Sequence, residues 1–213
     1  MHPQRNKHDI GEYYTPKSIA YYLTLKAILY YLNNEMESYS LEKELNLNKK
    51  ATSVWREKIS NLNILDPSCG DGVFLKTATT ILFDLNRKLD NNDTLSEKRS
   101  DKLVLEELIT HNIHGVDINK YKIKKSNLDF INEFKIDAID SKLYPIKYGN
   151  ALIEDSEFPS YFNWNKEYKS IMKDGGFDII IGNPPWGADM NKYKSYLCSK
   201  YPRIAFGQFD SFA

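Results

Sequence analysis

The sequence predicts an α/β fold with a doubly wound, mostly parallel sheet. Short apolar runs alternate with longer segments of helical periodicity, a pattern typical of βαβ units. Two of these runs, residues 63–66 and 113–119, carry an aspartate near the end and lead into a helical segment. A third run, residues 177–181, stops abruptly at Gly182 and two prolines. Open α/β sheets bind ligands beyond the carboxyl ends of their strands, so a ligand site is expected there.

Length, composition and charge limit the class of protein. A chain of 213 residues is expected to form one domain with a single large core. The formal net charge is +0, so DNA binding would need a local patch or a region outside the chain. Cys69 and Cys198 form neither a metal-ligand spacing nor a disulfide framework, so we expect no metal and a reducing compartment. No apolar run approaches transmembrane length and residues 1–9 lack a signal-peptide core, which predicts a soluble intracellular protein.

Residues 1–60 are predicted to form a helical region ahead of the α/β core, which takes residues 61–213. Thr15 can cap a helix over residues 17–32, with Pro16 at its first position. Apolar side chains at helical spacing predict the core-facing side of this helix: Ile19, Tyr22, Leu23, the stem of Lys26, Ala27 and Tyr30. The remainder of this region is polar and helix-permissive, without assignable chemistry.

A strand, a glycine-containing turn and a helix succeed one another over residues 63–85. The turn consists of Pro67, Ser68, Cys69, Gly70, Asp71 and Gly72. Its glycines let the backbone approach a ligand closely, and the following helix presents its first N–H groups. Asp71 disfavours a phosphate, whereas Asp66 at the strand end can accept a hydrogen bond from an amino group. The segment therefore predicts a site for a ligand that has an amino group and no phosphate.

The second predicted strand ends in Asp117 and precedes a helix over residues 120–134. A carboxylate at this position can accept hydrogen bonds from both hydroxyls of a ribose. The interval between Gly70 and Asp117 exceeds the roughly 20 residues of a minimal unit. We attribute the excess to a helix over residues 98–110, which follows a solvated loop at residues 90–93.

The rest of the predicted core carries signals that point to structure more than to chemistry. His114 is expected to pack or hydrogen-bond within its strand rather than act in catalysis. The lysines at positions 120, 122, 124 and 125 predict a solvated helix face. A third strand is expected over residues 146–152 and ends in a turn where Asn150 can address a nucleobase edge. Residues 154–176 form a polar, aromatic-rich connector, and residues 190–197 permit a short helix.

The apolar run at residues 177–181 predicts a buried strand that Gly182 ends. The segment that follows is Asn183, Pro184, Pro185 and Trp186. Proline has no backbone donor but keeps its carbonyl, so Asn183 and Pro184 offer two acceptors. Trp186 adds a flat surface on which a planar ring can stack. These groups suit the exocyclic amino group of a heterocycle such as adenine. The alternative is a structural Pro-Pro turn, with the tryptophan filling the core.

Taken in chain order, these motifs resemble those of the S-adenosylmethionine-dependent adenine-N6 DNA methyltransferases. The closest resemblance is to the catalytic region of Type IIG-like restriction–modification enzymes. The similar segments span nearly the whole chain: residues 11–16, 65–75, 114–119, 149–152, 183–186 and 207–212. Protein-glutamine and some RNA methyltransferases share the tetrapeptide. The Tyr-Tyr-Thr-Pro segment ahead of the glycine loop favours the DNA enzymes.

The resemblance implies a Rossmann-like class I methyltransferase fold that is incomplete at its C-terminus, in a prokaryotic cytoplasmic protein that uses S-adenosyl-L-methionine. The implied cofactor-binding residues are Tyr13, Thr15, Pro16, Asp66, Pro67, Ser68, Cys69, Gly70, Asp71, Gly72, Phe74, Asp117, Ile118, Asn150, Ala151 and Leu152. Among these, Thr15 would hold the methionine carboxylate, Asp117 the ribose and Asn150 the cofactor's adenine. Many relatives carry aspartate where Asn150 stands. An amide still offers an acceptor, so we expect weaker selectivity rather than loss of binding.

The expected chemistry follows from the target base. The amino nitrogen of adenine is a poor nucleophile because its lone pair is delocalised into the ring. Acceptors from the Asn183 side chain and the Pro184 carbonyl can favour a pyramidal nitrogen, which attacks the sulfonium methyl group in line. The base must leave the duplex, which costs a few kcal/mol, and stacking on Trp186 can offset roughly 1–3 kcal/mol.

Double-stranded DNA is therefore the expected partner, bound through a target-recognition region outside the chain. A fused or partner restriction nuclease is compatible with this class. The last residues resemble the start of a further helix, so we expect the chain to be part of a longer protein. A protein-glutamine or RNA amino methyltransferase remains an alternative, as does a cofactor-binding module that is inactive in isolation.

Overall fold

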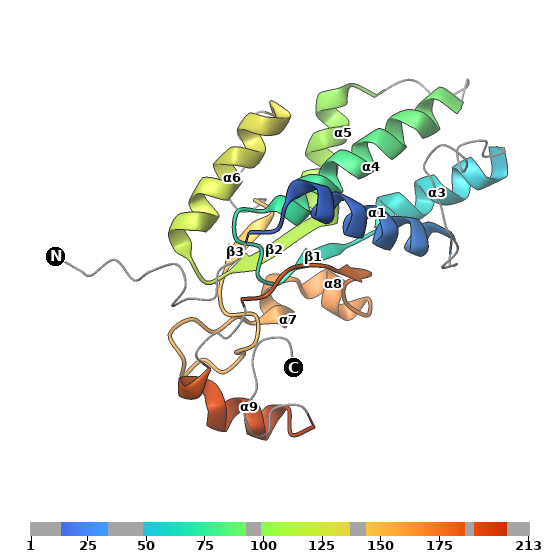
Figure 1. The fold of residues 1–213 in the computed structure, drawn as a ribbon. Helices are drawn as coiled ribbons and strands as arrows, with labels where there is room; N and C mark the ends of the chain where they lie inside the picture. Colours follow the sequence, from blue (N-terminus) through green and yellow to red (C-terminus); the bar gives the residue numbers. More distant parts are fainter. Residues whose placement is uncertain (1–13, 34–48, 93–98, 137–143, 186–189, 204–213) are drawn as a thin grey trace. The chain divides into compact units, whose positions relative to one another are not determined.

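The computed structural model describes residues 14–33, 49–92, 99–136, 144–185 and 190–203 (Figure 1). The chain divides into two compact units. The larger unit comprises residues 16–182, and the smaller comprises residues 1–15 together with residues 183–213. The predicted division into residues 1–60 and 61–213 remains a prediction.

A four-stranded parallel sheet forms the centre of the larger unit. Its strands are β1 (Ile64–Asp66), β2 (Ile113–Asp117), β3 (Ile146–Tyr148) and β4 (Ile179–Ile180). The spatial order is β3-β2-β1-β4, with Ile64 of β1 in register with Ile113 of β2 and Ile179 of β4. The predicted α/β fold with a parallel sheet is confirmed. Because the strands run in one direction, the residues that follow them gather at one edge.

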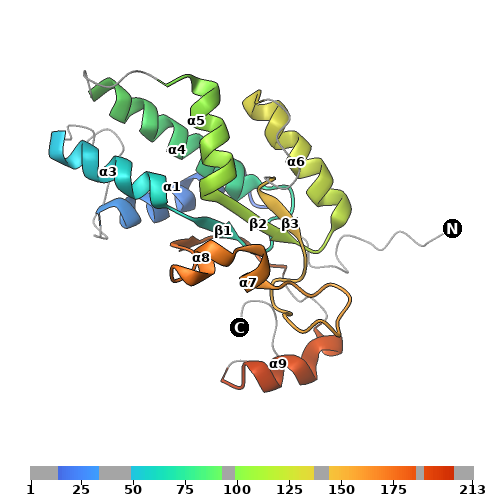
Figure 2. The same ribbon diagram turned by 180° about the vertical axis from the view of Figure 1, so that it is seen from behind.

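Helices cover both faces of this sheet (Figures 1 and 2). One group consists of α1 (Lys17–Asn33), α3 (Lys49–Asn61), α4 (Val73–Asn92), α5 (Asp101–Glu107) and α6 (Lys120–Phe134), and the other of α7 (Trp164–Glu167) and α8 (Lys169–Lys173). Successive strand residues point to opposite faces. Ile64 and Ile113 accordingly join the larger core under the first group. Leu65 and Val116 join the smaller core under α7 and α8.

Helix α1 confirms the predicted helix but buries a different face from the one predicted. Of the residues expected in the core, Ile19, Tyr22, Leu23 and Tyr30 are 50%, 60%, 44% and 52% exposed. The buried residues of the helix are Ala20, Thr24, Ile28, Leu29 and Leu32. Apolar residues occur all around this helix, so the periodicity does not select one face. The small side chains of Ala20 and Thr24 allow close packing, and α4 is the main contact of α1.

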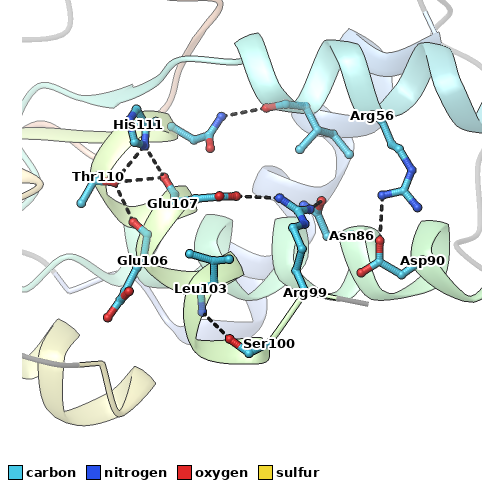
Figure 3. A network of polar contacts seen from close by, with 12 residues as sticks. Arg56, Asn86, Asp90, Arg99, Ser100, Leu103, Glu106, Glu107, Thr110 and His111 are labelled. Atoms are coloured by element: carbon cyan, nitrogen blue, oxygen red, sulfur yellow. Dashed lines mark hydrogen bonds and ion pairs between the residues drawn. The ribbon is translucent and has the colours of Figure 1, made fainter. Parts of the chain in front are cut away.

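Helix α4 continues to Asn92, so the solvated loop predicted at residues 90–93 is wrong for its described residues. Asp90 is 6% exposed and accepts hydrogen bonds from Arg56 of α3 at 2.7 Å and from Arg87 at 2.9 Å. Two guanidinium groups therefore compensate the charge that the sequence pattern assigned to solvent. This ion pair joins α3 to α4 (Figure 3).

Replacing Asp90 with alanine is expected to lower the free energy of unfolding by about 3 kcal/mol, because Arg56 and Arg87 both lose the buried carboxylate with which they pair. Urea denaturation followed by circular dichroism measures the change. Asp101→Ala is the matched control: Asp101 also pairs with Arg87, but its side chain is 76% exposed. That variant is expected to lose less than about 1 kcal/mol. Equal losses in the two variants would contradict the structural role of Asp90.

A polar network continues from this ion pair to α5 and the π-helix η2 (Leu108–Asn112) (Figure 3). Arg99 donates to Glu107 at 2.6 Å and to Asn86 at 3.3 Å. Asn112 donates to the carbonyls of Ile59 and Leu62, both at 2.7 Å. A pocket of about 500 Å³ lies among these helices. Its lining residues, all in the described part of the chain, include none of those predicted to bind cofactor or substrate.

The remaining elements of the larger unit agree with the predictions to different degrees. The helix predicted over residues 120–134 is confirmed as α6. The helix predicted over residues 98–110 is divided between α5 and η2. The predicted connector at residues 154–176 contains the short helices α7 and α8, because its aromatic residues pack on the smaller core.

Strand β4 corrects the expectation of a wholly buried strand at residues 177–181. Ile179 is 8% exposed, whereas Ile180 is 67% exposed. In the described sheet β4 pairs only with β1, so it forms an edge. Only one of its faces is covered, and alternate side chains separate accordingly.

The smaller unit carries a 3₁₀ turn, η4 (Asn191–Tyr193), followed by α9 (Lys194–Lys200). The short helix predicted at residues 190–197 is therefore confirmed in its location, and it extends further. Tyr193 and Leu197 anchor it, since they are 5% and 3% exposed. Among all described helices, none is both long enough and apolar enough to cross a membrane.

Candidate functional site

The turn between β1 and α4 brings the predicted glycine loop to the carboxyl edge of the sheet. Gly70 and Gly72 have φ angles of +54° and +75°, a region that favours glycine. Backbone bonds fix the turn: Cys69 N donates to Val116 O at 3.1 Å, and Gly72 N donates to Cys69 O at 2.8 Å. A Cβ added at Gly70 would meet no atom within 4 Å. A ligand can therefore approach the backbone at this glycine.

Asp66 lies at the end of β1 and is 1% exposed. Burial raises the pKa of its carboxyl to about 7. A hydrogen bond from Ser68 N, 3.0 Å from Oδ1, opposes this shift, while the charges of Asp117 and Asp71 add to it. The buried carboxylate is therefore matched to a cationic partner, which would restore its charged form.

Asp66 also contacts the residue that precedes the predicted catalytic segment. A Cβ added at Gly182 would lie 2.5 Å from Asp66 Oδ1, so only glycine fits beside this carboxylate. Ile181 N donates to Leu65 O at 2.9 Å and holds the two chain segments together. The end of β4 is thereby fixed against the start of the glycine loop.

Asp117 at the end of β2 holds two backbone donors. Its Oδ2 accepts from Gly70 N at 2.8 Å, and its Oδ1 accepts from Asn119 N at 2.7 Å. A carboxylate offers about four acceptor positions, so capacity for two hydroxyl donors remains. The neighbouring Ile118 is 49% exposed and offers an apolar surface. The combination suits a ribose with a planar base beside it.

The turn after β3 uses much of its polar capacity internally. Asn150 Oδ1 accepts from Leu152 N at 3.1 Å, and Asn150 N donates to Ser160 O at 2.7 Å. Ala151 O accepts from Trp164 Nε1 at 3.2 Å. The Asn150 amide thus shapes the turn, and its contact with a nucleobase edge remains a prediction.

Besides Asp66, two of the predicted cofactor-binding side chains are buried in the protein interior. Cys69 and Phe74 are 4% and 3% exposed. Burial raises the pKa of the Cys69 thiol well above its usual value. Any contribution of these two residues to a ligand site therefore runs through the backbone or through packing. In the same loop, Pro67 and Ser68 are half-buried and Asp71 is exposed.

In the smaller unit, the side chains of Thr15 and Asn183 meet although they lie 168 positions apart. Asn183 Nδ2 donates to Thr15 Oγ1 at 3.2 Å. This bond orients the amide and directs Asn183 Oδ1 away from Thr15. The expected capping role of Thr15 is not seen, because α1 begins at Lys17 and the carbonyl of Pro16 accepts its first backbone bonds.

The other members of the tetrapeptide are described only in part. Pro184 and Pro185 are half-buried. Tyr13 and Trp186 lie outside the described residues, so their predicted contacts with rings remain predictions.

His114 has the structural role that the sequence predicted. It is 8% exposed, and its Nε2 lies 3.0 Å from His111 O and 3.2 Å from Asn63 Oδ1. Its ring lies edge-on to Tyr168. Burial lowers its pKa to about 4, so it stays neutral at physiological pH.

Sequence reasoning missed three interactions that shape the site. Ser126 Oγ of α6 donates to Gly70 O at 3.0 Å and supports the loop. The other two are the close approach of Gly182 to Asp66 and the bond from Asn183 to Thr15. A glycine at the end of an apolar run was a signal for the close approach of Gly182 to Asp66. The bonds made by Ser126 and Asn183 join residues far apart in sequence, and no local pattern marks them.

The parallel sheet, its strand order and the acidic residues at the ends of β1 and β2 define a Rossmann-like α/β fold. Residues 111–213 match the family described as Eco57I restriction-modification methylase. The matched segment contains Asp117 and the tetrapeptide that begins at Asn183. The resemblance to restriction–modification methylases is thereby confirmed for this part of the chain.

A solved structure supports the fold over a longer stretch. The chain is similar to the Type IIL restriction-modification enzyme MmeI, whose structure was determined in complex with DNA, with a TM-score of 0.55 and 21% sequence identity. The similarity covers 92% of this chain and 26% of the MmeI chain, so the present chain spans about a quarter of that enzyme's length. The comparison with curated proteins gives no match.

Proposed function

We propose that this chain is the catalytic region of an S-adenosylmethionine-dependent DNA methyltransferase that modifies the N6 amino group of adenine in a restriction–modification system. The observation that carries the proposal is the family match over residues 111–213, which includes Asp117 and the tetrapeptide from Asn183 to Trp186. The DNA-bound state of the similar enzyme MmeI supports DNA as the methyl acceptor.

The residues around the glycine loop fit this cofactor. Asp66 would pair with its ammonium group, because a buried carboxylate with a pKa of about 7 gains most from a cationic partner. Asp117 would accept from the ribose hydroxyls, and Ile118 would pack on the adenine. Bound S-adenosylmethionine supplies a methyl group on a positively charged sulfur.

The chain's own residues would activate the target amino group. Asn183 Oδ1 and Pro184 O would accept its two N–H bonds, which localises the nitrogen lone pair. Thr15 supports this role, because its bond to Asn183 Nδ2 fixes the orientation of the amide. A hydroxyl group also has one donor, so Thr15 can bind a carboxylate while it accepts from Asn183. Holding two reactants at attack distance supplies roughly 7–11 kcal/mol of barrier lowering.

Cofactor affinity is expected to fall as the pH drops through about 7, the pKa of the Asp66 carboxyl in the unliganded chain. An ammonium partner favours the carboxylate form of Asp66, so cofactor binding lowers the pKa of this carboxyl. In buffers below about pH 7, the carboxyl therefore releases a proton when the cofactor binds. Below the pKa, the free protein must lose that proton before it pairs, and each pH unit weakens binding by about tenfold. Calorimetric titration with S-adenosylmethionine between pH 6 and pH 8 measures this change and its proton release.

The variant Asp66→Asn provides the control for this titration. It removes the titrating group and retains the acceptor for Ser68 N. We expect it to bind the cofactor weakly and with little dependence on pH. A wild-type affinity that stays constant across this pH range would contradict the pairing of Asp66 with the ammonium group.

The acceptor class is tested by competition between three substrates. Labelled methyl groups from S-adenosylmethionine are offered with duplex DNA, ribosomal RNA and a glutamine-containing release factor. Label on DNA alone supports the proposal, whereas label on RNA or on the protein would support the corresponding alternative. Cofactor binding without label on any acceptor would identify the chain as a binding module that needs the rest of a longer protein.

A further inference from the structure

A basic segment with interleaved tyrosines follows the tetrapeptide closely in the smaller unit. We define it as residues 190–203. Its charged residues are Lys192, Lys194, Lys200 and Arg203, and its aromatic residues are Tyr193, Tyr196 and Tyr201. The nearest acidic residues along the chain are Asp189 and Asp210. The whole chain balances 29 basic against 29 acidic residues, so this segment is a local departure from a neutral protein.

The fold of the basic segment separates its anchors from its charges. Tyr193 and Leu197 are buried and fix η4 and α9. All four basic side chains are exposed. The basic side chains therefore face solvent, while the buried side chains hold the helical backbone in place. Helix α9, which forms the middle of this segment, is labelled in Figure 1.

Lysines of the basic segment lie over tyrosine rings. Lys192 Nζ is 4.6 Å from the centre of the Tyr193 ring. Lys200 Nζ is 5.8 Å and 5.9 Å from the centres of the Tyr196 and Tyr201 rings. A ring positions an ammonium group without cancelling its charge, unlike a carboxylate. Tyrosine hydroxyls also donate to phosphate and sugar oxygens.

The lysine run on α6 shares one of these features, since Lys120 Nζ lies 4.4 Å from the centre of the Tyr148 ring, but it differs in the charges around it. Lys120, Lys124 and Lys125 are also exposed. Acidic residues of the same helix, Asp129 and Glu133, follow closely and lie 3.7 Å and 3.8 Å from Lys76 Nζ. The α6 run is thus part of a mixed-charge surface, whereas the basic segment has one sign of charge.

We propose that the basic segment binds the phosphate backbone of duplex DNA and holds the duplex where a target base is extruded. This inference rests on the proposed function, and it goes beyond it by assigning a DNA contact to this chain itself. Its charges are distributed over η4, α9 and the residues that follow, and suit several phosphates. Contacts of this kind position a duplex without reading its sequence. Because phosphate contacts do not depend on the identity of the bases, they would serve any recognition sequence. The tetrapeptide lies just ahead of the basic segment in sequence.

The salt dependence of DNA binding tests this assignment. A fluorescent duplex is titrated with the full 213-residue chain over about 50 to 200 mM NaCl, and anisotropy reports the affinity. The test variant carries Lys192→Gln, Lys194→Gln, Lys200→Gln and Arg203→Gln. The control variant loses the same charge on α6, through Lys120→Gln, Lys122→Gln, Lys124→Gln and Lys125→Gln.

Each lost phosphate contact reduces the slope of log affinity against log salt by about 0.9. We expect the test variant, which removes four charges, to lose about 3.6 units of slope and to bind at least about tenfold more weakly at low salt. The control variant should keep the wild-type slope. Circular dichroism establishes that both variants are folded.

Equal losses in both variants, an unchanged test variant, or a wild-type chain that does not bind duplex at low salt would each overturn the assignment. Titration of the same proteins with S-adenosylmethionine keeps the two proposals separate. If the cofactor fails to bind while the slope falls only in the test variant, the proposed function is wrong and the DNA contact stands. If the cofactor binds and the slopes do not differ, only the DNA contact is wrong.

Discussion

The variant Asn183→Ala is expected to transfer methyl groups about 10²–10³-fold more slowly than the wild-type chain, the range measured when one group that stabilises a transition state is removed. Its side-chain oxygen would accept from the target amino group only as the nitrogen becomes pyramidal. The loss should therefore fall on kcat, with little change in cofactor affinity. Asn183→Asp retains an acceptor and is expected to keep more activity than the alanine variant.

Single-turnover transfer from labelled S-adenosylmethionine measures this effect. The matched control is Asn191→Ala, which removes an exposed asparagine from the same unit. It should transfer at the wild-type rate. Normal turnover by Asn183→Ala would contradict the proposed activation of the amino group. An equal loss in both variants would indicate damage to the unit as a whole.

Asp117→Ala is expected to weaken cofactor binding by about 100-fold, because hydrogen bonds to a charged group contribute roughly 1.5–3 kcal/mol each. Two effects combine in this variant. The ribose hydroxyls would lose their acceptor, and Gly70 N and Asn119 N would lose the carboxylate that now binds them at 2.8 Å and 2.7 Å. The glycine loop would then be less well fixed before the ligand arrives.

Calorimetric titration at pH 8 measures the loss, with Asp129→Ala as control. Asp129 is an acidic residue of α6 whose side chain is 39% exposed and whose partner is Lys76. That variant should bind the cofactor normally. Unchanged affinity in Asp117→Ala would contradict the assignment of the ribose-binding carboxylate.

The sheet and its ligand edge could be predicted from short segments of sequence. Strands β1 and β2 each combine a short apolar run, a terminal aspartate and a following helix, and these signals lie within a few residues of one another. The glycine loop shows the same locality, since Gly70 and Gly72 adopt the positive φ angles that such a turn requires. Local chemistry determines these features, so the sequence reveals them.

The buried face of α1 could not be predicted in this way. Its apolar residues surround the helix, and the choice of face depends on the shape of α4, which packs against it. Asp90 is a similar case. Its burial depends on Arg56, which lies 34 positions away on another helix. Patterns of polarity describe a residue's own preference and do not reveal a distant partner.

The candidate site also contains features that local sequence predicts and features that it does not. The motifs identified Asp66, Asp117 and Asn183 as polar residues at strand ends. They did not reveal that Asp117 also binds the glycine loop, or that Thr15 orients Asn183 across 168 positions. The residue types at the site follow from local motifs, whereas their orientation arises from contacts that only the folded chain forms.

The identity of the methylated nucleoside tests the proposed adenine-N6 methyl transfer most directly. A duplex in which an adenine faces an abasic position lowers the cost of extruding that base. The chain is incubated with this duplex and isotopically labelled S-adenosylmethionine, and the DNA is digested to nucleosides for mass spectrometry. We expect label on the N6 nitrogen of deoxyadenosine, and loss of that label in Asn183→Ala. Label on cytosine, or unlabelled DNA from a chain that binds both cofactor and duplex, would contradict it.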